Sequence, residues 1–154
     1  MIAFILGRPL KGPGVTAASA MRAVEAVHGG LEIVDSRHLD DRSTFADLVA
    51  DNGSSAFHIT GPISLAPQGL DLSLEACLLE VDGRVTDSGT GASVHGHPGE
   101  ALALVANALA SRGLGLEEGW LVLAGGLTAA VAIEPSSRIA VHFTHLGSVV
   151  VSGG

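Results

Sequence analysis

The stretch ACLLEVDGRVTDSG, residues 76–89, contains two strand-like runs separated by the dipeptide Asp82-Gly83. Aspartate followed by glycine tolerates the positive φ angles that a two-residue hairpin turn requires. The runs on either side are rich in residues that favour extended structure. This stretch therefore predicts a β-hairpin, and it indicates a fold in which sheets dominate.

Two segments outside the hairpin have the pattern of helices. The apolar run over 98–112 has Pro98 in its first turn and Gly113 just past its end, which is the usual order of these two residues around a helix. A second helix is predicted over 17–28, where Thr16 can act as the N-cap. We expect both helices to pack against the sheets.

Short apolar runs make up most of the remaining chain and predict further strands. These strands are expected at 2–6, 31–35, 120–125, 130–135, 138–144 and 147–153. Segments 36–54 and 61–73 lack regular periodicity and are predicted to be loops. The predicted class is α+β, with two helices packed on a sheet or an open barrel.

The composition restricts the function. The chain has 154 residues, 47% of them hydrophobic and 16% charged, which fits one folded domain and excludes disorder. With 16 acidic and only 8 basic residues, the net charge is −8. This balance disfavours binding to nucleic acids or to anionic membranes.

The sequence also predicts the compartment. Cys77 is the only cysteine and lies in an apolar run, so we expect a buried thiol and a reducing cytoplasm. No signal-peptide pattern precedes the first strand. The longest uncharged apolar stretch, 120–133, is shorter than a membrane helix and is interrupted by Gly125-Gly126. We therefore expect a soluble protein without a membrane span.

Glu32 is the most informative acidic residue. It lies within LEIVDSR, residues 31–37, between Leu31 and Ile33. Because side chains alternate along a strand, Glu32 points away from the face that these two neighbours share. That face is either exposed to solvent, which makes Glu32 an ordinary surface acid, or it lines a cavity. In a cavity the carboxylate needs a cation or a donor such as Arg37.

Two further stretches carry polar groups that could bind a small molecule. In ADLVADNGSS, residues 46–55, polar side chains precede an apolar run, although the same residue types also build ordinary turns. Those side chains include Asp51, Asn52, Ser54 and Ser55. In AGGLTAAV, residues 124–131, a predicted strand ends at two glycines, so the backbone amides from Gly126 to Thr128 could hold a carboxylate.

Taken in order along the chain, these motifs resemble a known family. The motifs are IAFILGRPLKGPGVT, LEIVDSR, LVADNGSS, GLDL, LEVDGRVTDSGTGASVHGHPGEALALVANALASRGLGLEEG, GGLTAAV and LGSVVVSG. They resemble the 2-keto-4-pentenoate hydratase and 4-oxalocrotonate decarboxylase family of the fumarylacetoacetate hydrolase superfamily. The resemblance covers essentially the whole chain and corresponds to the C-terminal portion of the family's sequences.

The resemblance implies a mixed β-roll, a magnesium or manganese ion, and a small unsaturated 2-oxo acid as substrate. A hard cation would chelate the carboxylate and the 2-oxo oxygen and stabilise the enolate that forms in decarboxylation or hydration. By this resemblance Glu32 is a metal ligand. Glu32 and Asp51 are the expected catalytic residues. The expected substrate-binding residues are Asn52, Ser54, Ser55, Gly126 and Thr128.

The chain also departs from the family pattern. Family members have a Glu-x-Glu pair before the first strand, and here Met1 stands at the second of those positions. Only Glu32 remains of the three expected metal carboxylates, so we expect weak or absent metal binding. Three alternatives follow: a lyase, a metal-independent isomerase or cyclase that uses the same cavity, and a non-catalytic subunit that partners a full-length relative. We further expect a homodimer or larger assembly, since such a core leaves apolar surface uncovered.

Overall fold

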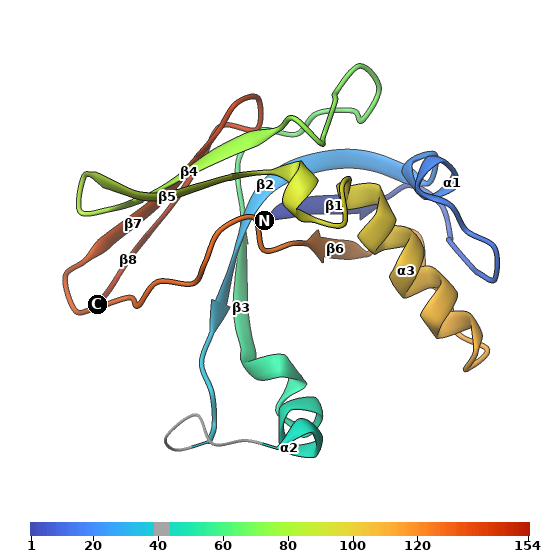
Figure 1. Cartoon of the computed structure of the whole chain (residues 1–154), viewed down its shortest axis with the longest axis horizontal. Coiled ribbons are helices and arrows are strands. Elements are labelled where there is room, and N and C mark those ends of the chain that lie inside the picture. Colours follow the sequence, from blue (N-terminus) through green and yellow to red (C-terminus); the bar gives the residue numbers. More distant parts are fainter. Residues whose placement is uncertain (39–43) are drawn as a thin grey trace.

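The computed structural model describes residues 1–38 and 44–154 and contains two four-stranded sheets (Figure 1). The first sheet has the order β3-β2-β1-β6, and its strands are β1 (Ile2–Leu6), β2 (Val24–Val34), β3 (Ser55–Thr60) and β6 (Leu121–Ala124). The second has the order β5-β4-β7-β8, with β4 (Ala76–Val81), β5 (Arg84–Thr90), β7 (Arg138–Phe143) and β8 (Ser148–Ser152). The strand pairs in the described residues are all antiparallel. A mixed sheet, which contains both parallel and antiparallel pairs, was expected, and the described residues do not form one.

The predicted hairpin is confirmed. β4 pairs with β5, and Val81 lies opposite Arg84, which leaves Asp82 and Gly83 as a two-residue turn. Their φ angles are 49° and 79°, the left-handed values that this turn type demands. The Asp82 side chain also accepts a hydrogen bond from the Arg138 amide at 2.7 Å, which ties the turn to β7.

The helix predicted over 98–112 is confirmed as α3 (Pro98–Ala110). The His97 ring accepts a hydrogen bond from the Gly99 amide at 2.9 Å and caps its first turn. Beside α3 lies the short helix α1 (Ala17–Met21) (Figure 1). Asn107 of α3 bonds both the amide and the carbonyl of Val15, at 2.9 and 2.8 Å, and so fixes the segment that enters α1.

The prediction of a helix as far as residue 28 is wrong. The Thr16 cap is present, but α1 ends at Met21 and β2 begins at Val24. Residues 24–29 pair with β1, and that long-range pairing outweighs the local helical pattern.

The first strand, β1, occupies the centre of the core. Ile2, Phe4 and Leu6 are completely buried, and β1 pairs with β2 on one side and β6 on the other. None of the described helices is both long and apolar enough to cross a membrane. Cys77 is buried, as its apolar surroundings predicted.

An extension, here called the arm, is formed by the described residues between 33 and 57. The end of β2 and the start of β3 project from the body, and α2 (Phe45–Ala50) lies at their far end (Figure 1). α2 corrects part of the predicted loop 36–54, of which residues 39–43 lie outside the described residues. Thr44 and Asp47 cap α2 reciprocally.

A second correction concerns residues 130–135, which form no strand. Residues 126–133, here called the strap, run without regular structure between β6 and the second sheet (Figure 1). The apolar side chains of the strap line a cavity. Their pattern therefore resembles that of a strand although the strap pairs with no sheet. The predicted loop 61–73 is confirmed, with a single bridge between Leu65 and Val27.

Candidate functional site

A cavity of about 660 Å³ lies between the two sheets. One wall comes from Met1, residues 31–34 at the end of β2, the following Asp35, and Phe57 of β3. The opposite wall consists of side chains from β4, β7 and β8, and the strap closes a third side. This volume suits a small-molecule ligand.

Glu32 lines this cavity, in agreement with the second of its two interpretations. It lies opposite His58 in the pairing of β2 with β3, near the point where the two strands leave the body as the arm. Asp35 also lines the cavity, at the root of the arm. Among the described residues, two acidic side chains therefore border the cavity, one near the end of β2 and one just after it.

Gly126 and Thr128, two of the expected substrate-binding residues, also line the cavity. The next amide, that of Ala129, donates to Asp87 Oδ2 at 3.0 Å. This hydrogen bond is the main reason that the pKa of Asp87 is lowered. Asp87 of β5 thus anchors the strap. The sequence analysis missed this role, because no local pattern links β5 to the strap.

Cys77 contributes a thiol to the apolar wall. Burial raises the pKa of this thiol, which opposes formation of the thiolate at neutral pH. The side chain therefore acts as a small apolar group in the wall.

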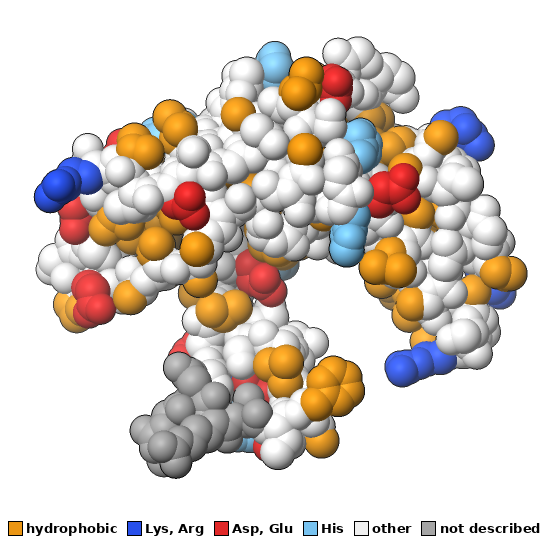
Figure 2. Space-filling model, viewed as in Figure 1, with side chains coloured by type: hydrophobic (Ala, Val, Ile, Leu, Met, Phe, Trp, Pro, Cys, Tyr) orange, Lys and Arg blue, Asp and Glu red, His pale blue; other side chains and the backbone are white. Residues whose placement is uncertain are grey.

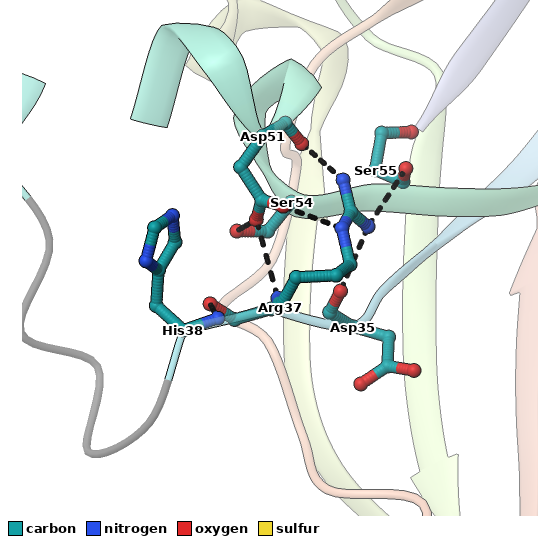
Figure 3. Close-up of polar contacts among 7 residues, drawn as sticks. Asp35, Arg37, His38, Asp51, Ser54 and Ser55 are labelled. Atoms are coloured by element: carbon teal, nitrogen blue, oxygen red, sulfur yellow. Dashed lines mark hydrogen bonds and ion pairs between the residues drawn. The ribbon is translucent and has the colours of Figure 1, made fainter. Parts of the chain in front are cut away.

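The polar residues of ADLVADNGSS lie in the arm and not in the cavity wall. The carboxylate of Asp51 forms an ion pair with the Arg37 guanidinium and accepts a hydrogen bond from Ser54 Oγ at 2.7 Å (Figure 3). Arg37 also donates to the carbonyl oxygens of Asp35, at 2.9 Å, and of Asp51 (Figure 3). Arg37, named above as one possible donor to Glu32, is thus engaged within the arm.

This network explains the unusual backbone around Asn52. Asn52 and Ser54 have φ angles of 54° and 60°, and Gly53 between them has 64°. Three successive left-handed residues are unfavourable without compensation, which the bonds to Asp51 supply. Neither Asn52, Ser54 nor Ser55 lines the cavity, so any contact of these residues with a substrate would have to come from a ligand that extends along the arm.

Acidification is expected to loosen the arm. The hydrogen bond from Ser54 and the positive charge of Arg37 hold the pKa of Asp51 below its usual value of 3.8. Its contribution to stability is therefore complete above about pH 4 and is lost as the pH falls through the lowered pKa. Amide hydrogen exchange of residues 37 and 51–55, corrected for the intrinsic rate, should be constant from pH 7 to 5 and rise below pH 4.

Two variants separate this effect from the titration of its neighbour. Asp51→Asn should expose these amides at every pH. Asp47→Asn should affect only the start of α2, because the pKa of Asp47 is lowered by its bonds to Thr44. An Asp51→Asn variant with unchanged protection would contradict the role assigned to the network.

The described residues do not by themselves fit a three-carboxylate metal centre. In residues 1–38 and 44–154 no group of three His, Cys, Asp or Glu side chains converges in a way that could hold an ion. Among the described residues that line the cavity, the acidic side chains are Glu32 and Asp35. Magnesium prefers an octahedral shell of oxygens.

The curated proteins most relevant to this chain are decarboxylases and hydratases of similar sequence. The chain is 38% identical over 148 residues to a 4-oxalocrotonate decarboxylase of Pseudomonas putida, covering 96% of this chain and 56% of the relative. It is equally 38% identical over 148 residues to a 2-keto-4-pentenoate hydratase of Paraburkholderia xenovorans, covering 96% of this chain and 55% of the relative. No protein-family model matches the chain.

The solved structures that resemble this chain include the same kind of enzyme. The 4-oxalocrotonate decarboxylase from Pseudomonas putida G7, complexed with magnesium and adipate, superposes with a TM-score of 0.95 at 35% identity, covering 99% of this chain and 58% of that one. A fumarylpyruvate hydrolase from Pseudomonas aeruginosa, in complex with Mn²⁺ and pyruvate, has a TM-score of 0.68 at 17% identity, covering 99% and 63%, and shares the fold. Over almost its whole length the chain is therefore similar to 4-oxalocrotonate decarboxylases and 2-keto-4-pentenoate hydratases, and it spans a little over half the length of those relatives.

Proposed function

We propose that this chain forms the cavity of a lyase that acts on small unsaturated 2-oxo acids, by decarboxylation or hydration through an enolate. The observation that carries this proposal is the 38% identity to both kinds of enzyme over 96% of the chain. The α+β fold, proposed in detail to be a β-roll with α1 and α3 packed on it, supports the same assignment.

Within the cavity, Glu32 is proposed to carry the proton transfers. A carboxylate beside an apolar wall can accept a proton from the carbon skeleton and return it at another carbon. The apolar strap and the second sheet would keep water away from the charged intermediate. Thr128 and the backbone of Gly126 are proposed to orient the substrate, since both border the same space as Glu32.

Asp51, Asn52, Ser54 and Ser55 are proposed to act through the arm. Asp51 has both carboxylate oxygens engaged, so it is better placed to position the arm than to move a proton. The arm begins where Asp35 borders the cavity, and its order would set how the cavity opens.

Glu32→Gln tests the proposal. The assays follow carbon dioxide release from 2-oxo-3-hexenedioate and hydration of 2-oxopent-4-enoate, with magnesium or manganese added. Loss of a general acid–base should lower kcat/KM by about 100-fold or more, as such groups contribute about 10²–10⁴-fold. Glu25→Gln on the exposed side of the same strand is the matched control and should keep full activity. Full activity in Glu32→Gln would refute the role of Glu32, and inactivity of the unmodified chain on both acids would refute the lyase proposal.

A second function, that of a subunit working with a longer relative, is favoured by the deficit of ligands in the cavity. The metal-bound decarboxylase matches this chain over only 58% of its own length, and the described residues that line the cavity here include two carboxylates. Co-elution with that decarboxylase, with activity only in the mixture, would favour the subunit over the independent lyase.

Self-association is also proposed, because the arm carries exposed apolar side chains. Phe45, Val49 and Phe57 are 82%, 63% and 69% exposed. Figure 2 shows hydrophobic side chains gathered around the tip of the arm. A homodimer or larger assembly would cover this surface. Light scattering measures the mass of the particle in solution and so tests this proposal.

A further inference from the structure

Two residues of β5 lie on the face of the second sheet that the strap crosses. Asp87 pairs with Leu79 of β4, and Gly89 pairs with Cys77. Leu79 and Cys77 both line the cavity, and residues directly opposite each other in a ladder present their side chains on the same face. Asp87 and Gly89 therefore belong to the inward face. They do not border the cavity themselves, and residues 127–129 of the strap contact them instead.

These contacts hold Thr128 from both sides. The amide that follows it, that of Ala129, donates to Asp87 Oδ2 at 3.0 Å. The carbonyl that precedes it, that of Leu127, lies so close to Gly89 that a Cβ there would be 2.1 Å from the oxygen. β5 thus contacts both peptide groups next to Thr128. Since Thr128 borders the cavity, β5 determines where this residue lies in the wall.

The Asp87 carboxylate is held in place for this contact. Its second oxygen, Oδ1, accepts a hydrogen bond from the Ser88 amide at 2.7 Å. Each oxygen thus has its own backbone donor, and rotation of the side chain would break both bonds. Both bonds favour the ionised form and lower the pKa of Asp87, so the contact with Ala129 persists through neutral pH.

The rest of the strap depends on this contact. In the described part of the chain, residues 130–133 take part in no hydrogen bond, although all of them line the cavity. The next fixed point is the Glu134 carbonyl, which accepts from the amide and the hydroxyl of Ser137 at 3.0 and 2.7 Å. Without the Asp87 contact, the stretch that lacks hydrogen bonds would begin directly after β6.

We propose that Asp87 is a positioning residue for the substrate. Through the Ala129 amide it fixes Thr128 and the adjoining backbone, so that the Thr128 hydroxyl and the Gly126 backbone meet the substrate in one orientation. Asp87 does not border the cavity, so it acts only through the strap. The inference rests on the proposed function, in which Thr128 and Gly126 orient the substrate, and it adds a residue from the second sheet.

A purely structural role for Asp87 would have a different kinetic effect. A loss of stability lowers the fraction of folded protein and so the apparent kcat, while the KM of the molecules that remain folded stays the same. A misplaced Thr128 weakens substrate binding in every molecule, which raises KM. The two kinetic constants therefore distinguish the two roles.

Three variants test the inference. Asp87→Ala removes the acceptor for Ala129, and Asp87→Asn keeps one acceptor oxygen. Asp82→Ala is the matched control, because Asp82 also accepts from a distant backbone amide of the same sheet, that of Arg138 at 2.7 Å, but not from the strap. KM and kcat are measured with 2-oxopent-4-enoate and 2-oxo-3-hexenedioate in the presence of magnesium or manganese. Hexanoate binding, measured by calorimetry, and amide hydrogen exchange at Ala129 give two readouts that need no turnover.

Asp87→Ala should raise both KM and the dissociation constant of hexanoate by about 10-fold, the usual effect of losing one hydrogen bond to a ligand. Its kcat should change by less than about 3-fold, since the reacting groups are untouched. Hydrogen exchange at Ala129 should become faster by about 10-fold or more as its acceptor is lost. Asp87→Asn and Asp82→Ala should keep KM and the hexanoate constant within about 2-fold of those of the unmodified chain.

An unchanged KM and hexanoate constant in Asp87→Ala, together with faster exchange at Ala129, would overturn the inference and leave the lyase proposal intact. An equal rise in Asp82→Ala would also overturn it, because the effect would not be specific to the strap. If the unmodified chain binds hexanoate but turns over neither acid, the lyase proposal fails alone, and the hexanoate constants of the variants decide the role of Asp87. Absence of both turnover and binding would overturn both proposals.

Discussion

Glu75→Ala is expected to lower the free energy of unfolding by about 3 kcal/mol, because it leaves buried hydrogen-bond donors without a partner. Glu75 is 1% exposed, and its carboxylate accepts from the amides of His145 and Leu146 at 2.8 and 3.3 Å. It also pairs with His145 Nδ1 at 2.7 Å. These bonds join the start of β4 to the turn between β7 and β8, so the variant loses a link across the second sheet. Urea denaturation at pH 7 measures the change.

Two variants accompany this measurement. Glu118→Ala removes an exposed glutamate and should change the free energy by less than about 0.5 kcal/mol. His145→Ala keeps both amide bonds to Glu75 and should cost less than Glu75→Ala. A loss below about 1 kcal/mol for Glu75→Ala would mean that water satisfies these amides, contrary to the burial described here.

Gly89→Ala is expected to destabilise the fold by about 3 kcal/mol and to abolish ligand binding in the cavity. A Cβ at Gly89 would lie 2.1 Å from the Leu127 carbonyl oxygen, which is backbone and cannot rotate away. The strap must move for the methyl group to fit. Since Gly126 and Thr128 flank this carbonyl, the displacement reaches the polar side of the cavity directly.

Thermal unfolding of the Gly89→Ala variant measures its loss of stability, and hexanoate binding measures the change in the cavity separately. Ser88→Ala changes the exposed neighbour on β5 and should leave both quantities unchanged. Normal ligand binding by a folded Gly89→Ala variant would show that the position of the strap is unimportant for the site.

The parts of the fold that were predictable from the sequence are those with local causes. Asp82-Gly83 specifies its hairpin through backbone angles, and Pro98 marks the start of α3 through its fixed φ. Residues 22–28 were misassigned because their state depends on β1, a partner that no local pattern reveals. The strap was misassigned because an apolar run that lines a cavity resembles a strand that lines a core.

The candidate site was predictable to a similar degree. The strand pattern left two interpretations of Glu32 open, a surface acid and a cavity-lining acid, and the structure places Glu32 at the cavity. Asp51 looked equivalent by composition, yet its bonds to Arg37 and Ser54 commit it to the arm. Which polar residue faces a ligand depends on tertiary placement, and spacing along the chain does not encode that placement for isolated residues. The apolar wall was invisible for the same reason, since β4, β7 and β8 come together only in the folded sheet.

The position of β1 between β2 and β6 has a consequence for biosynthesis. Its partner β2 follows closely in the chain, but β6, which pairs with Ile2 through Ala124, emerges from the ribosome about 115 residues after β1 ends. At about 5–20 residues per second, that interval lasts about 6–23 s. During this time the most apolar strand of the protein has one edge unpaired, and it is exposed to neighbouring nascent chains on the same message. Until translation passes residue 124, the edge of β1 that later pairs with β6 is therefore open to pairing with another strand.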